Sequence, residues 1–455
     1  MTLEDIPIIK LFMCNGRYYL YDCYKNRVLC ITKQLFSEIN ELNKLGVQRY
    51  IDSNRNTTEY DAIISLIQKG YFKSNFIKRI EHPETFIVKH IIDRCLNDIT
   101  LQVTRNCNFS CRYCMFSNCN GLSRVHENVD MTWDVAKNAI DFLYEHSKDA
   151  QEITIAFYGG EPMLNYSVIK KVVLYAKTKF STKRVRYLMT TNCSIMPDDA
   201  IDFFIEHDFE LTVSFDGPES IQNKHRRLRN NGDHTFEIVQ KNVCKIKSRS
   251  KEYFQTNITF LPVFFEDEDY NLIGQFFDDL GVEGDKIHKV LADLKGIDYS
   301  LNRGTLISRE QLNLVENNRN IDIQYTNIYN NKTELPSVWH HNGPCIPAMQ
   351  RLFVNVAGTF HMCEKSMEDE HLSIGSLESG IDFDRVRRFM NIGKLTESQC
   401  KNCWAMRYCN ICLMFCNDVE KKQISKDKKL LACKQIKDDV LAFFKKQLSQ
   451  TDLEN

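Results

Sequence analysis

The sequence predicts an α/β protein of several domains whose largest part is a parallel sheet of six β/α units, closed or partly closed into a barrel. Three observations lead to this prediction. The chain has 455 residues, which exceeds the usual size of a single hydrophobic core. Strand-like and helix-like stretches alternate through its middle, and its cysteines gather in one loop and in the tail. We expect domains at residues 1–95, 96–295 and 341–455, with a bridging segment at 296–340.

Composition and charge exclude several classes of protein. Hydrophobic residues make up 43% of the chain and charged residues 26%, as in ordinary globular proteins. The formal net charge of −1 gives no support for a general nucleic-acid or anionic-membrane surface. No run of about 18 apolar residues appears, and the N-terminus lacks a basic-then-apolar signal segment. We therefore expect a cytoplasmic protein with no nucleic-acid or membrane partner.

The first domain begins with three short runs of alternating apolar and polar residues between positions 8 and 31. Asn15-Gly16 and Lys25-Asn26 separate these runs as turns, so the stretch predicts a three-stranded meander. Two helical stretches follow at residues 34–45 and 57–69. Three strands with helices, ahead of a separate larger body, look like a small winged-helix module. A plain packing domain is the alternative.

The second domain alternates between strands and amphipathic helices. Such repeats predict a parallel sheet with crossover helices, in which active sites lie at the carboxyl ends of the strands. The expected strands are residues 99–103, 153–158, 185–190, 211–215, 257–263 and 287–291, and the expected helices are residues 133–146, 168–180, 198–207, 234–247 and 269–280.

Three cysteines follow the first of these strands with the spacing C-x3-C-x2-C: Cys107, Cys111 and Cys114. A short loop with this spacing can direct three thiolates to one point, and thiolates bind soft metals and iron–sulfur clusters. If Cys119 is not a fourth ligand, one metal position stays open for an exogenous chelator. A zinc knuckle and unrelated buried cysteines are the alternatives.

Polar groups also follow the next three strands. Two glycines allow close approach of the backbone, and a carboxylate comes directly after them. Any one of these groups could be an ordinary turn. A polar group at each successive strand end is much harder to explain in that way. The groups are Gly159-Gly160-Glu161-Pro162, Thr190-Thr191-Asn192, and Ser214 with Asp216-Gly217-Pro218, beyond which lies His225-Arg226-Arg227.

The tail holds a second concentration of cysteines. In a reducing compartment such cysteines are more often metal ligands than disulfide partners. A zinc ribbon is the structural alternative. The tail cysteines are Cys345, Cys363, Cys400, Cys403, Cys409, Cys412, Cys416 and Cys433. The scattered cysteines Cys14, Cys23, Cys30, Cys95, Cys119, Cys193 and Cys244 are expected to be small buried apolar residues.

Together these motifs closely resemble the radical S-adenosylmethionine (radical SAM) superfamily over residues 99–291. The resemblance depends on C-x3-C-x2-C, on Tyr113 before the third cysteine, and on Gly-Gly-Glu-Pro. It implies a partial (β/α)6 barrel in which the three cysteines hold three irons of a [4Fe–4S] cluster, while S-adenosylmethionine chelates the fourth. An electron from a flavodoxin- or ferredoxin-type reductant would then yield a 5′-deoxyadenosyl radical.

The resemblance also assigns residues to the cofactor. Gly159, Gly160 and Glu161 would contact its amino group, Ser214 and one of Arg226 or Arg227 its carboxylate, and Thr191 and Asn192 its ribose, with Tyr113 also on the cofactor side. An arginine fork is well matched to a carboxylate, which agrees with this assignment. No general base can be assigned from the sequence.

The tail resembles the SPASM extension of radical enzymes that mature peptides and proteins, which holds two auxiliary clusters. The resemblance implies that Cys400, Cys403, Cys409 and Cys433 bind one cluster, and that Cys345, Cys363 and Cys412 bind the other. The spacing from Cys409 to Cys412 is one residue shorter than usual, and no cysteine lies between Cys345 and Cys363. Cys416 is the candidate for the missing ligand; otherwise a substrate thiolate could bind there.

The whole chain looks most like maturases of cysteine-rich ribosomal peptides. This resemblance implies a precursor peptide whose leader binds the N-terminal module as an added edge strand, in the manner of a RiPP recognition element (RRE-like). The expected product is a thioether between a cysteine sulfur and a carbon of another residue. Carbon–carbon linkage, epimerisation and formylglycine-type sulfatase maturation are alternatives in the same class, and a zinc- or cluster-containing binding protein is the alternative outside it.

Overall fold

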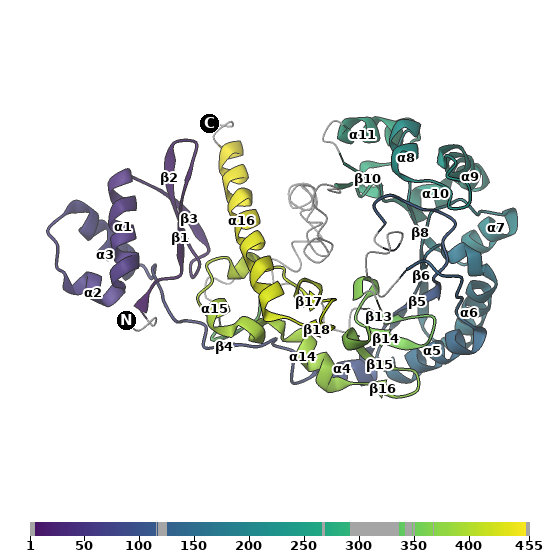
Figure 1. The fold of residues 1–455 in the computed structure, drawn as a ribbon, viewed down its shortest axis with the longest axis horizontal. Coiled ribbons are helices and arrows are strands. Elements are labelled where there is room, and N and C mark those ends of the chain that lie inside the picture. Colours follow the sequence, from purple (N-terminus) through teal and green to yellow (C-terminus); the bar gives the residue numbers. More distant parts are fainter. Residues whose placement is uncertain are drawn as a thin grey trace.

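The structure is a computed structural model that describes residues 5–114, 116, 125–265, 269–291, 336–341, 348, 351–366 and 368–451. The N-terminal region and the parallel sheet lie at opposite ends of the longest axis, and the C-terminal cysteine-rich region lies between them (Figure 1). The expected bridging segment falls outside the described residues except at 336–340, and so do Cys119 and Cys345.

The N-terminal region confirms the expected meander and both helices, and it adds a short helix that the sequence did not indicate. The strands pair antiparallel in the order β1-β2-β3. Thr32 and Thr57 start the two expected helices, because their hydroxyls accept hydrogen bonds from the backbone N–H of Leu35 and Tyr60. The elements are β1 (Ile9–Cys14), β2 (Arg17–Asp22), β3 (Arg27–Ile31), α1 (Lys33–Leu45), α2 (Val47–Asp52) and α3 (Thr58–Gln68).

The middle of the chain forms the expected parallel sheet, with five strands in sequence order. They are β5 (Asp98–Thr104), β6 (Glu152–Gly159), β7 (Arg184–Thr191), β8 (Glu210–Val213) and β9 (Ile258–Phe260). The helices are α4 (Val88–Cys95), α5 (Trp133–His146), α6 (Tyr166–Lys179), α7 (Asp198–Glu206), α8 (Glu219–His225), α9 (Phe236–Arg249), α10 (Lys251–Asn257) and α11 (Asp269–Asp279).

The two faces of this sheet differ in burial. On β6, Ile153, Ile155 and Phe157 are fully buried, whereas the alternate residues Thr154 and Tyr158 are only half-buried. Since side chains alternate across a strand, one face packs in the hydrophobic core and the other faces a more open space. The residues of the core face come from every second position of the strands, as the apolar pattern predicts.

The sixth expected strand lies beside β9 but is interrupted. Its backbone N–H groups at His288 and Val290 bond to the carbonyls of Phe260 and Pro262 at 2.8 Å each. Pro262 has no N–H group to continue the ladder. The strand predicted at 257–263 therefore splits into β9 and β10 (Val263–Phe264), and the sixth strand shortens to β11 (Val290–Leu291), which pairs with β10 in parallel.

The C-terminal region extends the same sheet at its β5 edge, which the sequence did not indicate. β13 pairs parallel with β5, and the next three strands add to it antiparallel. The extension consists of β13 (Leu352–Val354), β14 (Thr359–His361), β15 (Ser373–Ser376) and β16 (Gly380–Ile381), which gives nine strands in the order β16-β15-β14-β13-β5-β6-β7-β8-β9.

The remaining elements are short, apart from the last helix. They comprise the strand pairs β4 (Arg79–Ile80) with β12 (Val338–Trp339), and β17 (Asn417–Asp418) with β18 (Gln423–Ile424); the helices α14 (Phe383–Met390), α15 (Glu397–Lys401) and α16 (Lys426–Thr451); and the 3-10 turns η2 (Pro162–Asn165), η3 (Gly284–Lys286), η4 (Glu364–Ser366), η5 (Glu370–Leu372), η6 (Ile392–Thr396), η7 (Met406–Tyr408) and η8 (Leu413–Cys416).

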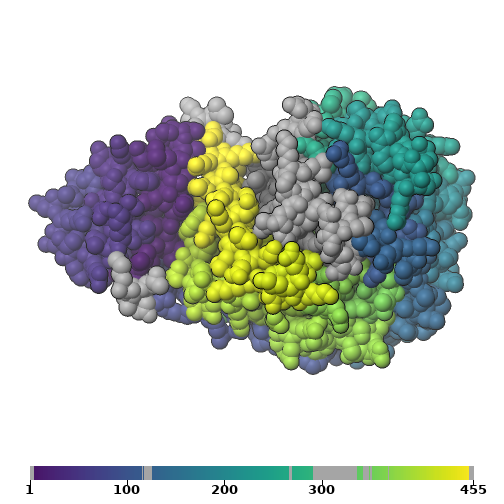
Figure 2. All heavy atoms as spheres, viewed as in Figure 1, coloured from purple at the N-terminus to yellow at the C-terminus, as the bar shows by residue number. Residues whose placement is uncertain are grey.

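Helix α16 lies against the N-terminal strands (Figure 2). The ring of Phe444 packs on that of Tyr21, with ring centres 4.8 Å apart. Arg407, which is 1% exposed, donates hydrogen bonds of 2.6 and 2.7 Å to the backbone carbonyls of Cys23 and Tyr24. The N-terminal region is therefore fixed to the cysteine-rich region by both apolar and polar contacts.

Within the described residues, no helix combines the length and the apolar character that a membrane span requires.

Candidate cluster and cofactor site

The C-x3-C-x2-C loop follows β5 directly, as expected. Cys107 and Cys111 are buried and Cys114 is half-buried. The pKa of Cys107 and of Cys111 is raised to about 12, mainly by burial and in smaller part by the neighbouring thiols of the loop. The three thiols therefore lie within electrostatic range of one another, and they would ionise only with a positive charge such as iron beside them.

The backbone of this loop is fastened to the segment that follows α8. The two segments run antiparallel where Phe109 pairs with Leu228. The ring of Phe109 is buried, at 1% exposed. The bonds are Ser110 N–H to Arg227 O at 2.8 Å, Arg112 N–H to His225 O at 2.9 Å, and Arg229 N–H to Asn108 O at 2.8 Å. The loop is thus held by main-chain hydrogen bonds.

Gly159 and Gly160 support the loop from the end of β6. A Cβ atom on Gly159 would lie 2.3 Å from the carbonyl oxygen of Thr104, and one on Gly160 would lie 2.1 Å from that of Asn106. The backbone N–H groups of Gly160 and Glu161 donate to these same two carbonyls. Only glycine fits here, because the loop backbone occupies the space of a side chain.

Glu161 connects the ends of β6 and β7. It is fully buried, and its carboxylate accepts hydrogen bonds from the Thr191 hydroxyl at 2.7 Å and from the Asn192 backbone at 2.6 Å. A third bond comes from the Met163 backbone at 3.1 Å. Burial raises the pKa of Glu161 to about 7, although these donors act in the opposite direction. Both carboxylate oxygens are therefore used inside the protein.

Asn192 lies next to the loop as well. Its side-chain amide donates to the Asn108 oxygen at 2.9 Å, and Asn108 donates in turn to the Ser194 hydroxyl at 2.8 Å. Ser214 and Arg227 are half-buried, and the Ser214 backbone bonds to Thr191 O at 2.9 Å. The structure thus brings the residues expected at the second, third and fourth strand ends to one edge of the sheet.

Asp216 organises three residues whose relation the sequence did not reveal. Its carboxylate accepts two hydrogen bonds from the Arg226 guanidinium, at 2.8 and 2.9 Å, and one from the Tyr113 hydroxyl at 2.9 Å. The same guanidinium lies 5.2 Å from the centre of the Tyr113 ring. Asp216 is fully buried and Arg226 is 6% exposed. Arg226 is therefore engaged by Asp216, which the Asp-Gly-Pro turn after β8 positions.

Replacing Asp216 with asparagine is expected to lower the free energy of unfolding by about 3–5 kcal/mol, because the Arg226 guanidinium would stay buried without its counterion. Thermal and denaturant unfolding would measure this loss. Asp202→Asn is the matched control, since Asp202 pairs with Arg249 on the surface with both side chains about half exposed, and its loss of stability should be much smaller. Equal losses in the two variants would contradict the role of Asp216.

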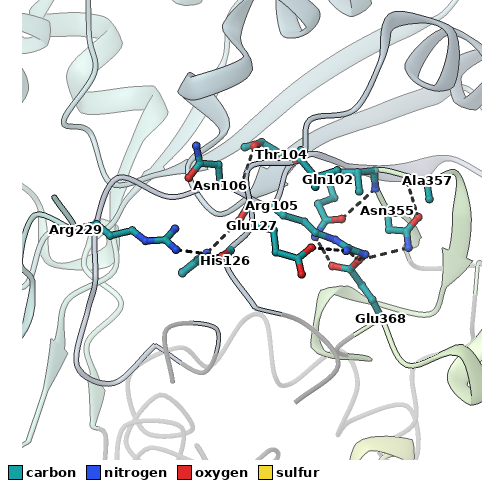
Figure 3. Close-up of polar contacts among 12 residues, drawn as sticks. Gln102, Thr104, Arg105, Asn106, His126, Glu127, Arg229, Asn355, Ala357 and Glu368 are labelled. Atoms are coloured by element: carbon teal, nitrogen blue, oxygen red, sulfur yellow. Dashed lines mark hydrogen bonds and ion pairs between the residues drawn. The ribbon is translucent and has the colours of Figure 1, made fainter. Parts of the chain in front are cut away.

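His126 is a site residue that the sequence analysis missed. Its Nε2 lies 3.6 Å from the Cys114 sulfur, and its Nδ1 lies 3.2 Å from the Arg105 carbonyl oxygen. Arg229 donates to the His126 carbonyl at 3.2 Å (Figure 3). A single histidine twelve residues after the last cysteine has no motif spacing, so no pattern in the sequence pointed to it.

A cavity of about 520 Å³ opens beside Cys107, which is the size of a small-molecule site. Its lining consists of Asn106, Cys107, Asn108, Asn128, Leu228, Arg229 and Asn230. The lining combines asparagine side chains and Arg229 with a larger share of apolar surface and includes no carboxylate, so it offers hydrogen-bonding groups and one positive charge to a ligand.

A buried ionic network joins β5 to the C-terminal extension (Figure 3). The side chain of Glu368 is 1% exposed and accepts hydrogen bonds from Gln102, from Arg105 Nε at 3.0 Å and from Asn355 at 3.5 Å. Arg105 also pairs with Glu127 at 3.1 Å. Since Arg105 lies two residues before Cys107, the extension contacts the base of the cysteine loop.

The tail cysteines form a second group. The thiols of Cys400, Cys403, Cys409 and Cys433 lie within electrostatic range of one another. Cys416 is buried near Cys412, Cys433 and Cys400, while Cys363 follows β14 and is half-buried. Among the described residues, no three or more His, Cys, Asp or Glu side chains are placed to share a single metal ion.

The profile described as the Radical SAM superfamily matches residues 101–273. Residues 101–273 are a radical SAM domain. Over these residues the chain is similar to radical SAM enzymes, a family that implies S-adenosylmethionine and one [4Fe–4S] cluster as cofactors.

The relatives differ in how much of the chain they cover. The radical SAM cyclopropyl synthase TigE of Paramaledivibacter caminithermalis is 23% identical over 404 residues, which is 82% of this chain and 79% of TigE. The uncharacterized protein MJ0907 of Methanocaldococcus jannaschii is 35% identical over 124 residues. This match spans 27% of this chain and 40% of MJ0907.

Among solved structures, native anSMEcpe with bound AdoMet and the Cp18Cys peptide has the same fold. The TM-score is 0.54 at 17% identity, and the match covers 79% of this chain and all of that one.

Proposed function

We propose that the chain is a peptide maturase that removes hydrogen from a carbon of a bound precursor and joins a cysteine sulfur to that carbon as a thioether. The observation that carries the proposal is the presence of two separate groups of mutually close thiols, one in the loop after β5 and one in the tail. A radical SAM domain accounts for the first group alone. The second group supports additional clusters that act on the substrate or on its electron.

The residues of the first group fit a [4Fe–4S] cluster with one open iron. The three thiols lie within electrostatic range of one another, and the cavity beside Cys107 would receive S-adenosylmethionine. When bound, the cluster and cofactor supply a carbon-centred radical that takes a hydrogen atom from the substrate. Arg227 is the stronger of the two proposed carboxylate partners, because Asp216 already engages Arg226.

The other proposed cofactor residues act in part through the loop. Gly159 and Gly160 hold its backbone close, and their carbonyls are the groups that would accept from the cofactor amino group. Glu161 fixes Thr191 and Asn192, the proposed ribose contacts. Tyr113 is held by Asp216 beside Cys114. These residues therefore order the site even where they do not contact the cofactor.

We place the second cluster on Cys400, Cys403, Cys409 and Cys433, and the third on Cys345, Cys363 and Cys412. Cys416 lies near Cys412 but also near Cys400 and Cys433, so its burial is compatible with either group. If Cys416 does not bind the third cluster, an iron is open to a substrate thiolate. A flavodoxin- or ferredoxin-type protein would supply the electrons.

The N-terminal module would bind the precursor leader at β3. Within the described residues β3 pairs only with β2, and Arg27 and Cys30 on it are exposed. β1 at the other edge contacts α16 and is less available. An added peptide strand needs an open edge of this kind. We therefore expect the leader at the β3 edge, opposite the β1 edge that contacts α16.

Carbon–carbon bond formation is the second candidate, because the similarity to the cyclopropyl synthase TigE covers most of the chain. Both reactions remove two hydrogens from the peptide, so the mass change alone does not separate them. The number of free thiols does, since a thioether consumes one and a carbon–carbon bond consumes none.

The test is co-expression with a small cysteine-rich peptide encoded beside this gene, followed by mass spectrometry after alkylation. We expect a loss of two hydrogens and of one alkylatable cysteine per linkage. Loss of two hydrogens with every cysteine still alkylatable would favour the second candidate. Two or three clusters require about 8–12 irons per chain. An unchanged peptide, together with stoichiometric zinc instead of this iron, would overturn the proposal.

A further inference from the structure

Lys429 is a fully buried lysine in the first turn of α16. Its Nζ lies 2.6 Å from the Thr396 hydroxyl and 3.5 Å from the Gly393 carbonyl oxygen. It also lies 3.6 Å from the sulfur of Cys400. The lysine therefore points into the group of tail cysteines and away from solvent.

A buried ammonium is costly unless a negative charge lies beside it. No ion pair among the described residues includes Lys429, so no carboxylate of this part of the chain compensates it. Its titratable neighbours from the packed segment 340–341 are His340 and His341, and burial lowers the pKa of His340 to about 3. These imidazoles are neutral and offer no anion.

The thiols are the remaining source of negative charge. The Thr396 hydroxyl lies 3.3 Å from the Cys400 sulfur, so Lys429 and Thr396 both face the same ligand. Cys433 follows Lys429 by one helical turn on α16, and the amine is within electrostatic range of Cys433 and Cys416. The amine thus lies beside one cysteine sulfur and within electrostatic range of two more.

We propose that Lys429 is the internal counter-charge of the auxiliary cluster held by Cys400, Cys403, Cys409 and Cys433, and that it sets that cluster's reduction potential. This inference rests on the proposed function, which places the cluster there. Net charge and hydrogen bonds to the sulfurs are among the factors that set such potentials. A positive charge that donates to a ligating sulfur favours the more negative, reduced state, and so raises the potential.

The test is a redox titration followed by electron paramagnetic resonance, in a background in which Cys107, Cys111 and Cys114 are all alanine. That background leaves only the auxiliary clusters in the spectrum. Lys429→Met should shift the midpoint of one cluster to a more negative potential, while Lys429→Arg should keep it near the original value. Lys434→Met is the matched control, because Lys434 lies next to Cys433 on α16 but is exposed, and solvent screens its charge.

Lys437 provides a graded comparison. It is half-buried and within electrostatic range of Cys403 and Cys433, so Lys437→Met should shift the midpoint less than Lys429→Met. Iron content is measured in parallel. Loss of about four irons in Lys429→Met but not in Lys429→Arg would also support the inference, because charge would then be needed to hold the cluster.

Two results would overturn it: an unchanged midpoint in Lys429→Met with full iron content, or equal iron loss in the methionine and arginine variants. Failure of the cluster assignment on which the proposed function depends looks different. In that case the background protein with its lysines intact would hold no iron, whatever stands at position 429.

Discussion

Replacing Cys107, Cys111 or Cys114 with alanine is expected to reduce cleavage of S-adenosylmethionine to the level seen without enzyme. Each thiolate would hold a separate iron of the cluster. Backbone hydrogen bonds fix the loop, so no other side chain of the loop can take the place of a missing thiolate. Anaerobic assays of 5′-deoxyadenosine formation under dithionite would measure the loss, and iron content should fall by about four per chain.

Cys244→Ala is the matched control for these variants, because Cys244 is exposed on α9 and touches none of the cysteine groups. Cys119→Ala tests the sequence argument that the fourth iron must stay open, and cleavage should persist in it. Cleavage at the original rate in any of the three loop variants would remove that cysteine from the cluster.

Replacing Gly160 with alanine should have a large structural effect, although it adds only one methyl group. The new Cβ would lie 2.1 Å from the Asn106 carbonyl oxygen and 2.9 Å from the Cβ of Cys107, so the loop must move. We expect the free energy of unfolding to fall by about 3 kcal/mol or more, together with loss of the loop cluster. Thermal unfolding and iron analysis would measure the two effects.

Gly284→Ala controls for the methyl group itself, since a Cβ at Gly284 in η3 would meet no atom within 4 Å. Its unfolding free energy should change by less than about 0.5 kcal/mol. If Gly160→Ala kept both its stability and its iron content, the close packing of β6 on the cysteine loop would not be needed for the site.

The strands of the parallel sheet and the cysteine loop could be predicted because their signals are local. Apolar alternation marks a strand, and C-x3-C-x2-C marks a loop with converging thiols. The fifth strand was predicted as one continuous strand because the apolar pattern continues through Pro262, where the missing N–H group divides it into β9 and β10. The three-residue strands β13 and β14 carry too few residues to show a period of two.

The contacts within the site could not be predicted because they join residues far apart in the sequence. Asp216 and Arg226 were both noted at a strand end, yet nothing in their spacing shows that one holds the other or that both hold Tyr113. Glu161 shows the reverse case. The resemblance assigned it to the cofactor, whereas the structure shows both of its oxygens bonded to neighbouring protein groups.

The network around Glu368 means that the motif boundary near residue 341 does not separate two folding units. A chain truncated there would lose β13 from the edge of β5, and it would leave Arg105 and Gln102 without the carboxylate they share. The cysteine loop would then follow an edge strand that pairs only with β6. The barrel and its extension should therefore unfold in one cooperative step, and the radical domain is not a portable module that could be excised or exchanged alone.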